Sequence, residues 1–242
     1  MPSYGGAMSG HENVEIFTSA PYGGDPAVGS PAQVRETDKL RIAKIAVGPY
    51  NNNAYLLTCT ETGAKLLIDA AAEPDRLLAL TAAMEPASAP LTKVVTTHGH
   101  ADHWQGLAEV IAQTGAVTYA GRHDAEDIPV ATEGVLDHGD TVAFGLIVLD
   151  AIHLQGHTEG SIALAYTEPG GRSHIFTGDC LFPGGVGKTW DDPERFDQLL
   201  SGVERHIFDL FGDDTAIYPG HGHDTTLGEQ RPHLAEWRER GW

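Results

Sequence analysis

Hydrophobic and polar residues define strand and helix patterns in the first half of the chain. Short apolar or β-branched runs between glycine, proline and asparagine turns predict strands, and apolar residues three and four apart predict helices. In order, the predicted elements are strands at 42–47, 54–60 and 65–68, a helix at 74–84, a strand at 94–97, and a helix that starts at Asp102 or His103 and ends before Gly115.

The second half of the chain loosely repeats this order of strands, helix and strand. Its predicted helix starts at Asp192-Pro193, where a capping aspartate precedes a proline at the first helical position. The predicted strands lie at 116–120, 141–144, 146–153, 161–166, 173–177 and 215–218. Strands mixed with helices in both halves predict an α/β (α+β) fold.

Residues 1–39 differ from the rest because Gly, Pro and Ser are frequent there. We interpret this segment as a Gly/Pro-rich N-terminal arm with at most one short strand, at 14–17. The chain is long enough for one large domain or two small ones. We expect residues 40–242 to form a single domain.

Cysteine usage and hydropathy suggest the compartment. The 242 residues include two cysteines, Cys59 and Cys180, so the sequence predicts neither a disulfide framework nor a thiolate metal site. No apolar run approaches the ~20 residues of a membrane span, and the first twenty residues lack a basic, apolar signal peptide. We expect a soluble, cytoplasmic protein.

The charge balance is strongly acidic. Asp and Glu number 34 against 15 Lys and Arg, which gives a formal net charge of −19. Such a field repels phosphate backbones and anionic lipid headgroups. We expect neither a nucleic-acid nor a membrane partner, and the sequence leaves self-association into a homo-oligomer open.

A dense group of ligand-type side chains follows the strand predicted at 94–97. Three imidazoles and a carboxylate fall within the six residues 98–103, between that strand and a predicted helix. His98 and His100 are two apart and can point to the same side of an extended turn, whereas Asp102 and His103 are adjacent and must diverge. The turn thus offers ligands to two neighbouring metal ions.

Three more polar residues follow predicted strands, each beside glycine. They are His157 in Gly156-His157, Asp179 in Gly178-Asp179 and His221 in Gly220-His221. Together with the histidine turn they complete two ligand sets. The first set is His98, His100 and His157; the second is Asp102, His103 and His221; Asp179 remains, with two oxygens that can bridge the ions.

These motifs resemble those of the metallo-β-lactamase-fold hydrolase superfamily, and most closely its glyoxalase II-like (hydroxyacylglutathione hydrolase-like) branch. The resemblance covers about residues 40–225: His98–His103 matches the H-x-H-x-D-H signature, and the glycine-linked His157, Asp179 and His221 match the later motifs. It implies a four-layer αβ/βα sandwich of two mixed β-sheets flanked by helices, with a catalytic site at one sheet edge. Asp69, at the end of its strand, matches an early aspartate that would orient a ligand histidine or the histidine loop.

A further stretch of the chain resembles the thioesterases of this branch. Residues 176–182, followed by Gly187-Lys188, are similar to the thioesterase segment that carries the bridging aspartate and a substrate-anchoring lysine. Lys188 is thus either a ligand for a substrate carboxylate or a solvated loop lysine. Trp190 either lines the pocket or packs in the core, and we expect core packing. Glyoxalase II continues further beyond its last histidine to hold glutathione, whereas 21 residues follow His221 here.

The resemblance implies a mechanism. Two divalent ions, with Zn²⁺ expected and Fe or Mn as alternatives, would hold a bridging hydroxide oriented by Asp102 and Asp179. That hydroxide would attack the carbonyl of a small thioester or ester. One alternative is a lactonase, and another is a persulfide dioxygenase-like oxidoreductase with one iron. The presence of both His103 and His221 favours two ions.

Overall fold

The first of two large sheets contains seven strands in chain order. The computed structural model describes residues 15–241. The strands are β1 (Gln33–Glu36), β2 (Leu40–Val47), β3 (Asn52–Cys59), β4 (Lys65–Ile68), β5 (Leu91–Thr96), β6 (Val117–Gly121) and β7 (Gly134–Leu136). Strands β1 to β4 pair antiparallel, and β4 to β7 pair parallel. All eight residues of β3 are buried, as expected for a central strand covered on both faces.

The second sheet contains six strands in the order β15-β14-β11-β10-β9-β8. Its outer strands β8 and β9 alternate between buried and exposed residues, the pattern of a sheet with one face in solvent. A short hairpin, β12–β13, lies beside this sheet. The strands are β8 (Thr141–Phe144), β9 (Ile147–His153), β10 (Ile162–Thr167), β11 (Ser173–Gly178), β12 (Leu181–Phe182), β13 (Gly185–Val186), β14 (Ala216–Pro219) and β15 (Thr225–Thr226).

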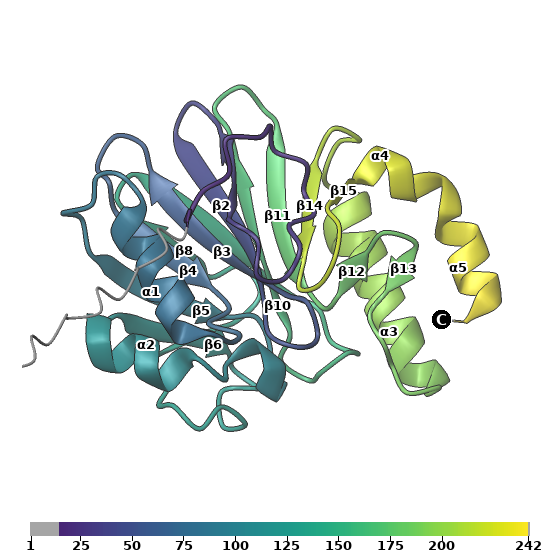
Figure 1. Ribbon diagram of the computed structural model, residues 1–242. Coiled ribbons are helices and arrows are strands. Elements are labelled where there is room, and N and C mark those ends of the chain that lie inside the picture. The colour runs from purple at the N-terminus through teal and green to yellow at the C-terminus, as the bar shows by residue number, and fades with distance from the viewer. Residues whose placement is uncertain (1–14, 242) are drawn as a thin grey trace, which may run out of the picture.

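Helices pack on the outer face of each sheet, and in the second sheet they leave the exposed face of β8 and β9 in solvent. Helices α1 (Pro74–Ala83) and α2 (Leu107–Thr114) pack on the first sheet, and α3 (Pro193–Val203), α4 (Leu227–Gln230) and α5 (Leu234–Arg240) lie on the side of the second (Figure 1). The α3 helix starts as predicted, because the Asp192 carboxylate caps it by accepting from the amides of Glu194 and Arg195. A π-helical turn, η2 (Glu204–Phe208), extends α3.

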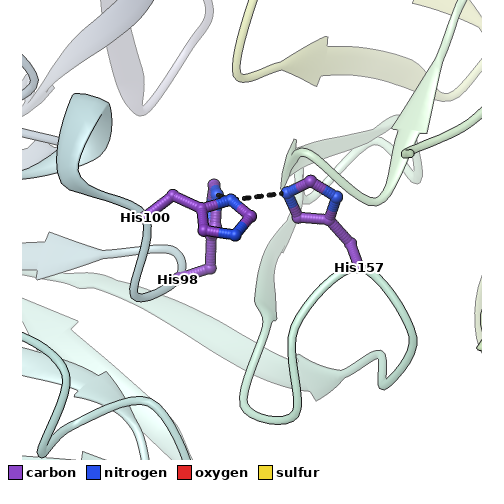
Figure 2. A group of neighbouring side chains, drawn as sticks. All are labelled: His98, His100 and His157. Atoms are coloured by element: carbon purple, nitrogen blue, oxygen red, sulfur yellow. Dashed lines mark hydrogen bonds between the residues drawn. The ribbon is translucent and has the colours of Figure 1, made fainter. Parts of the chain in front are cut away.

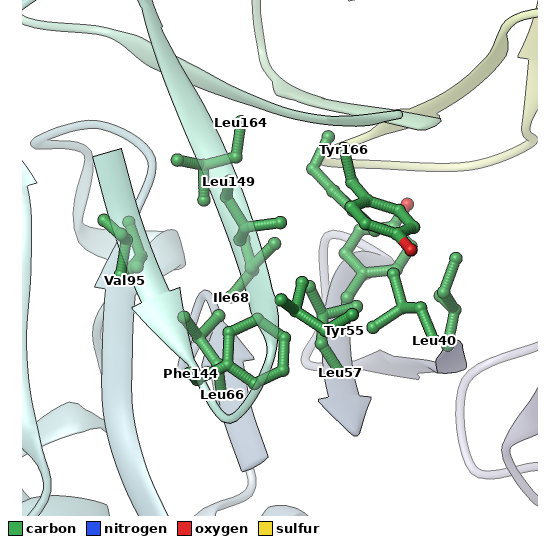
Figure 3. Close-up of a cluster of buried hydrophobic side chains, with 14 of the residues drawn as sticks. Leu40, Tyr55, Leu57, Leu66, Ile68, Val95, Phe144, Leu149, Leu164 and Tyr166 are labelled. Carbon is green, nitrogen blue, oxygen red and sulfur yellow. The ribbon is translucent and has the colours of Figure 1, made fainter. Parts of the chain in front are cut away.

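The main core lies between the two sheets. Its side chains come from both: Leu57 and Leu66 from the first, Leu149 and Leu164 from the second (Figure 3). Separate apolar clusters join each sheet to its own helices. The layers are therefore helix, sheet, sheet and helix, which confirms the predicted αβ/βα sandwich.

Several elements differ from the sequence prediction. The helix expected from Asp102 or His103 is a 3₁₀ turn, η1 (Ala101–His103), and α2 begins at Leu107, because the Gly106 amide donates to the carbonyl of Ala70 instead of continuing a helix. Strands β1, β7 and β15 and helices α4 and α5 were not predicted, since these short segments carry no clear apolar period.

The N-terminal residues that the structure describes join the fold. Strand β1 pairs with β2 at the edge of the first sheet, and Phe17 bridges Ala32. The division into an arm (1–39) and one domain (40–242) stays a prediction, and residues 1–14, including the start of the strand predicted at 14–17, lie outside the described residues. Among residues 15–241, no helix is long and apolar enough to cross a membrane.

Candidate metal centre

The first ligand set gathers at the carboxyl end of β5. His98 and His100 come from the turn after this strand, and His157 comes from the loop between β9 and β10 and faces them (Figure 2). The Nδ1 atom of His100 lies 3.0 Å from Nε2 of His98 and 3.0 Å from Nε2 of His157. One metal ion could therefore be bound by all three imidazoles.

The second ligand set lies beside the first. His103 and His221 approach to 3.2 Å between their Nε2 atoms, although they are 118 residues apart. The Oδ2 atom of Asp102 lies 3.4 Å from Nε2 of His221. These three residues offer two nitrogens and a carboxylate oxygen to a second ion.

Asp179 stands between the two sets. Its Oδ1 lies 3.5 Å from Nε2 of His103, and its Oδ2 lies 3.6 Å from Nε2 of His157 and 3.4 Å from Nε2 of His221. Oδ1 is buried and has no hydrogen-bond partner within the described part of the chain. A buried carboxylate oxygen without a donor is costly unless a cation neutralises it, so the residues present fit metal ions.

Glycine allows this close approach. A Cβ atom at Gly220 would lie 2.3 Å from Oδ1 of Asp179 and 2.8 Å from Cε1 of His103. The position therefore requires a residue without a side chain. This explains why Gly220 directly precedes His221.

Four of the five histidines are oriented through Nδ1, which leaves Nε2 directed at the centre. His157 donates to the carbonyl of Lys188 at 2.9 Å, and His221 donates to that of Tyr50 at 2.9 Å. His103 contacts Asp69, and His98 contacts the Thr97 hydroxyl. These acceptors favour the tautomer in which Nε2 carries the free lone pair of a metal ligand.

Asp69 supports two of these histidines. Its Oδ2 lies 2.8 Å from Nδ1 of His103 and accepts from the Thr97 hydroxyl, whose oxygen lies 3.1 Å from Nδ1 of His98. Its Oδ1 accepts from the Thr97 amide. Asp69 thus occupies the position from which the predicted orienting role can be performed.

The pKa values of the histidines differ between the two ligand sets. Burial lowers the pKa values of His98 and His157, so these imidazoles are neutral near pH 7 and able to coordinate. For His221, burial acts in the opposite direction to its hydrogen bonds with Asp102 and Asp179, and the bonds raise its pKa to about 10. The second set therefore attracts positive charge, and a divalent cation would replace the proton on His221.

Asn52 is a site residue that the sequence analysis missed. Its buried amide donates to Oδ2 of Asp102 at 2.9 Å and lies 3.5 Å from Nε2 of both His103 and His221. It touches every member of the second ligand set. An asparagine within a polar turn gives no sequence signal of such a role, although the turn precedes a buried strand.

Lys188 and Trp190 lie in the loop after β13, and each lines a cavity. The Lys188 side chain is exposed beside a cavity of about 350 Å³, while its carbonyl holds His157. Trp190 is 45% exposed and stacks on His157 with ring centroids 5.4 Å apart, so the expectation of core packing was wrong. Trp190 also lines a second cavity of about 470 Å³ together with His100 and His157.

Known proteins identify the class. The chain matches the metallo-beta-lactamase superfamily over residues 47–223, and it belongs to this superfamily. Membership implies divalent metal ions, in agreement with the grouped histidines and aspartates.

Individual proteins of known sequence or structure are also similar to this chain. A probable hydroxyacylglutathione hydrolase, glo2 of Schizosaccharomyces pombe, is 31% identical over 179 residues, which cover 72% of this chain and 65% of that relative. The chain thus spans less than two thirds of that protein's length. Among solved structures, TTHA1623 in a di-iron-bound form is 30% identical with a TM-score of 0.63, covering 78% of this chain and 96% of that one. ETHE1 from Myxococcus xanthus is 27% identical with a TM-score of 0.69, covering 82% and 84%.

Proposed function

We propose that the protein is a binuclear metallo-hydrolase that cleaves a small thioester or ester. The position of Asp179 carries this proposal: its two carboxylate oxygens lie within 3.6 Å of histidines from both ligand sets. A carboxylate so placed can bridge two ions, and a mononuclear centre would leave Asp102, His103 and His221 without a function.

We assign the ligands as predicted from the sequence. His98, His100 and His157 would hold one ion, and Asp102, His103 and His221 the other, with Asp179 shared and Zn²⁺ as the expected metal. Such ions supply a water activated at neutral pH and polarise the substrate carbonyl. The di-iron-bound form of TTHA1623 makes a pair of irons the first alternative to zinc.

The protein's own groups would orient the reactants. Asp102 and Asp179 accept the hydrogen bonds of the attacking water and fix its direction, while Asn52 holds Asp102 in place. A substrate in the cavity lined by His100, His157 and Trp190 would meet the Trp190 ring as an aromatic wall. The exposed Lys188 ammonium, two residues before Trp190, would offer a partner for a substrate carboxylate. A thiolate leaves with little acid assistance, so hydrolysis of a thioester requires no dedicated general acid.

The named relatives support thioesters as the substrate class. The similarity to a probable hydroxyacylglutathione hydrolase favours an acyl thioester. The oxidoreductase alternative stays in the test. We retain a small-molecule substrate, no nucleic-acid or membrane partner, homo-oligomerisation and a cytoplasmic location as further expectations.

The test is turnover of a substrate panel by the purified protein and by Asp179→Ala. The panel contains an acyl thioester, a simple ester, a lactone and a persulfide with oxygen monitored. We expect thioester hydrolysis by the wild type and a loss of at least 100-fold in Asp179→Ala, because one truncation removes the bridging ligand. Asp197→Ala, an exposed carboxylate paired with Arg238, is the control and should retain activity. Oxygen consumption on the persulfide without thioester hydrolysis would contradict the proposal.

A further inference from the structure

A buried lysine ties the loop that carries His221 to the N-terminal segment. The Nζ atom of Lys44 donates to the carbonyls of Gly222 and Gly24, each at 2.7 Å, and to Oδ1 of Asp224 at 2.6 Å. Lys44 is fully buried, and its three hydrogens all have acceptors. One side chain thus holds the residue after His221 and a residue of the N-terminal segment together.

The N-terminal segment makes its own contacts with the same loop. The Tyr22 hydroxyl donates to Oδ2 of Asp224 at 2.5 Å. The Asp224 amide donates to the carbonyl of Gly24 at 3.0 Å. Gly24 has a φ of +75°, and a Cβ there would lie 3.0 Å from Cβ and Oδ2 of Asp224. The two backbones pack so closely that only glycine fits without strain.

The other side of this loop is held by β3. The Asn53 side chain donates to the carbonyls of Pro219 and Gly222, and the Tyr55 hydroxyl donates to that of Pro219 at 2.6 Å. His221 therefore sits on a loop fixed from two directions. The contacts from β3 lie within the superfamily match at 47–223, whereas Tyr22, Gly24, Lys44 and Asp224 lie outside it.

We propose that Tyr22 and Gly24, acting through Asp224 and Lys44, are positioning residues for His221 and so for the second metal ion. The inference rests on the proposed two-ion centre. The second ion depends on His221, which is partly exposed and reaches the centre from a loop, whereas His103 is fully buried. Loosening the loop should therefore lower the affinity for the second ion. The affinity of the first ligand set, on the opposite side of Asp179, should stay unchanged.

Two small substitutions test this without removing a buried charge. Tyr22→Phe deletes only the hydroxyl and keeps the ring beneath the Arg35 guanidinium, 4.4 Å from its centroid. Gly24→Ala adds one methyl group against Asp224. Ser30→Ala is the matched control, because it removes a hydroxyl from the same segment. Within residues 15–241 this hydroxyl bonds only to the carbonyls of Ala27 and Pro31.

The first measurement is amide hydrogen exchange of the metal-free full chain, resolved by mass spectrometry. We expect exchange in a peptide covering residues 219–224 to accelerate at least fivefold in Tyr22→Phe and Gly24→Ala, since the Asp224 amide bonds directly to Gly24. In both test variants, exchange in α1 should match that of the wild type. In Ser30→Ala, exchange at 219–224 should also match the wild type. Unchanged exchange at 219–224 in both test variants would overturn the inference.

The second measurement is a titration of metal-free protein with Co²⁺, followed by visible absorption in competition with a chelator. We expect the affinity for the second ion to fall about tenfold in both test variants and the affinity for the first to stay unchanged. An equal loss of affinity for both ions would indicate general destabilisation and would overturn the positioning role. A wild type that binds one ion contradicts the proposed function instead, and hydrogen exchange then decides the inference alone.

Discussion

The Oδ2 atom of Asp69 lies 2.8 Å from Nδ1 of His103, and both side chains are almost completely buried. This contact joins the end of β4 to the histidine turn after β5, two neighbouring parallel strands. Burial acts to lower the pKa of His103, but the Asp69 carboxylate outweighs it and raises this pKa. Asp69 therefore fixes the ring and increases its basicity as a ligand.

Replacing Asp69 by Asn should weaken metal binding while preserving the fold. The amide retains an acceptor for the Thr97 amide but loses the charge that acts on His103. We expect the affinity for the second ion, which His103 would bind, to fall about 10- to 100-fold. Chelator competition measures this affinity. Asp137→Asn, a surface carboxylate paired with Arg122, serves as the control. Wild-type affinity in Asp69→Asn would show that His103 needs no carboxylate partner.

Lys188→Ala separates the two functions of this residue. The carbonyl that holds His157 belongs to the backbone and remains, so metal content should not change. Loss of the ammonium should raise KM for an anionic acyl substrate about tenfold, the effect of one charge-assisted hydrogen bond, and leave kcat nearly constant. Lys188→Arg should recover most of the loss. An unaltered KM would remove the side chain from the substrate site.

His174 should make stability depend on pH. It is fully buried between Oε1 of Glu168 at 2.7 Å and the Tyr218 hydroxyl at 2.8 Å, and burial lowers its pKa below 6.5. The unfolded chain then binds a proton more readily than the folded protein. The stabilisation from neutral His174 is complete above about pH 6.5 and is lost as the pH falls toward the lowered folded pKa, by at most about 1.4 kcal/mol per pH unit.

Urea unfolding between pH 7.5 and 5 measures this dependence. The free energy of unfolding should fall more steeply with acidification in the wild type than in His174→Gln, which cannot be protonated there. The difference between the two proteins removes the contribution of the other histidines. Parallel curves would contradict the assignment.

The sequence predicted those parts of the centre that follow from local patterns. His98 to His103 lie within one turn after a strand, and His157, Asp179 and His221 each follow a strand beside a glycine. The three later residues complete the two ligand sets that the histidine turn begins, so these motifs indicated one site. The helix, sheet, sheet, helix order followed from the resemblance that the same motifs carried.

The remaining parts depend on tertiary contacts that no local pattern encodes. The roles of Asn52 and of the Tyr50 carbonyl arise because the β2–β3 turn meets the loop of His221, about 170 residues away. Backbone carbonyls carry no residue type, so the Lys188 contact with His157 was equally hidden. Tyr22 lies in a Gly/Pro-rich stretch whose composition resembles a free arm.

The central claim is a pair of ions bridged by Asp179, and elemental analysis of the purified protein tests it most directly. Analysis by mass spectrometry, after dialysis against metal-free buffer, should find close to two divalent ions per chain and no more than one in Asp179→Ala. One iron per wild-type chain, unaffected by loss of His221, would contradict the account.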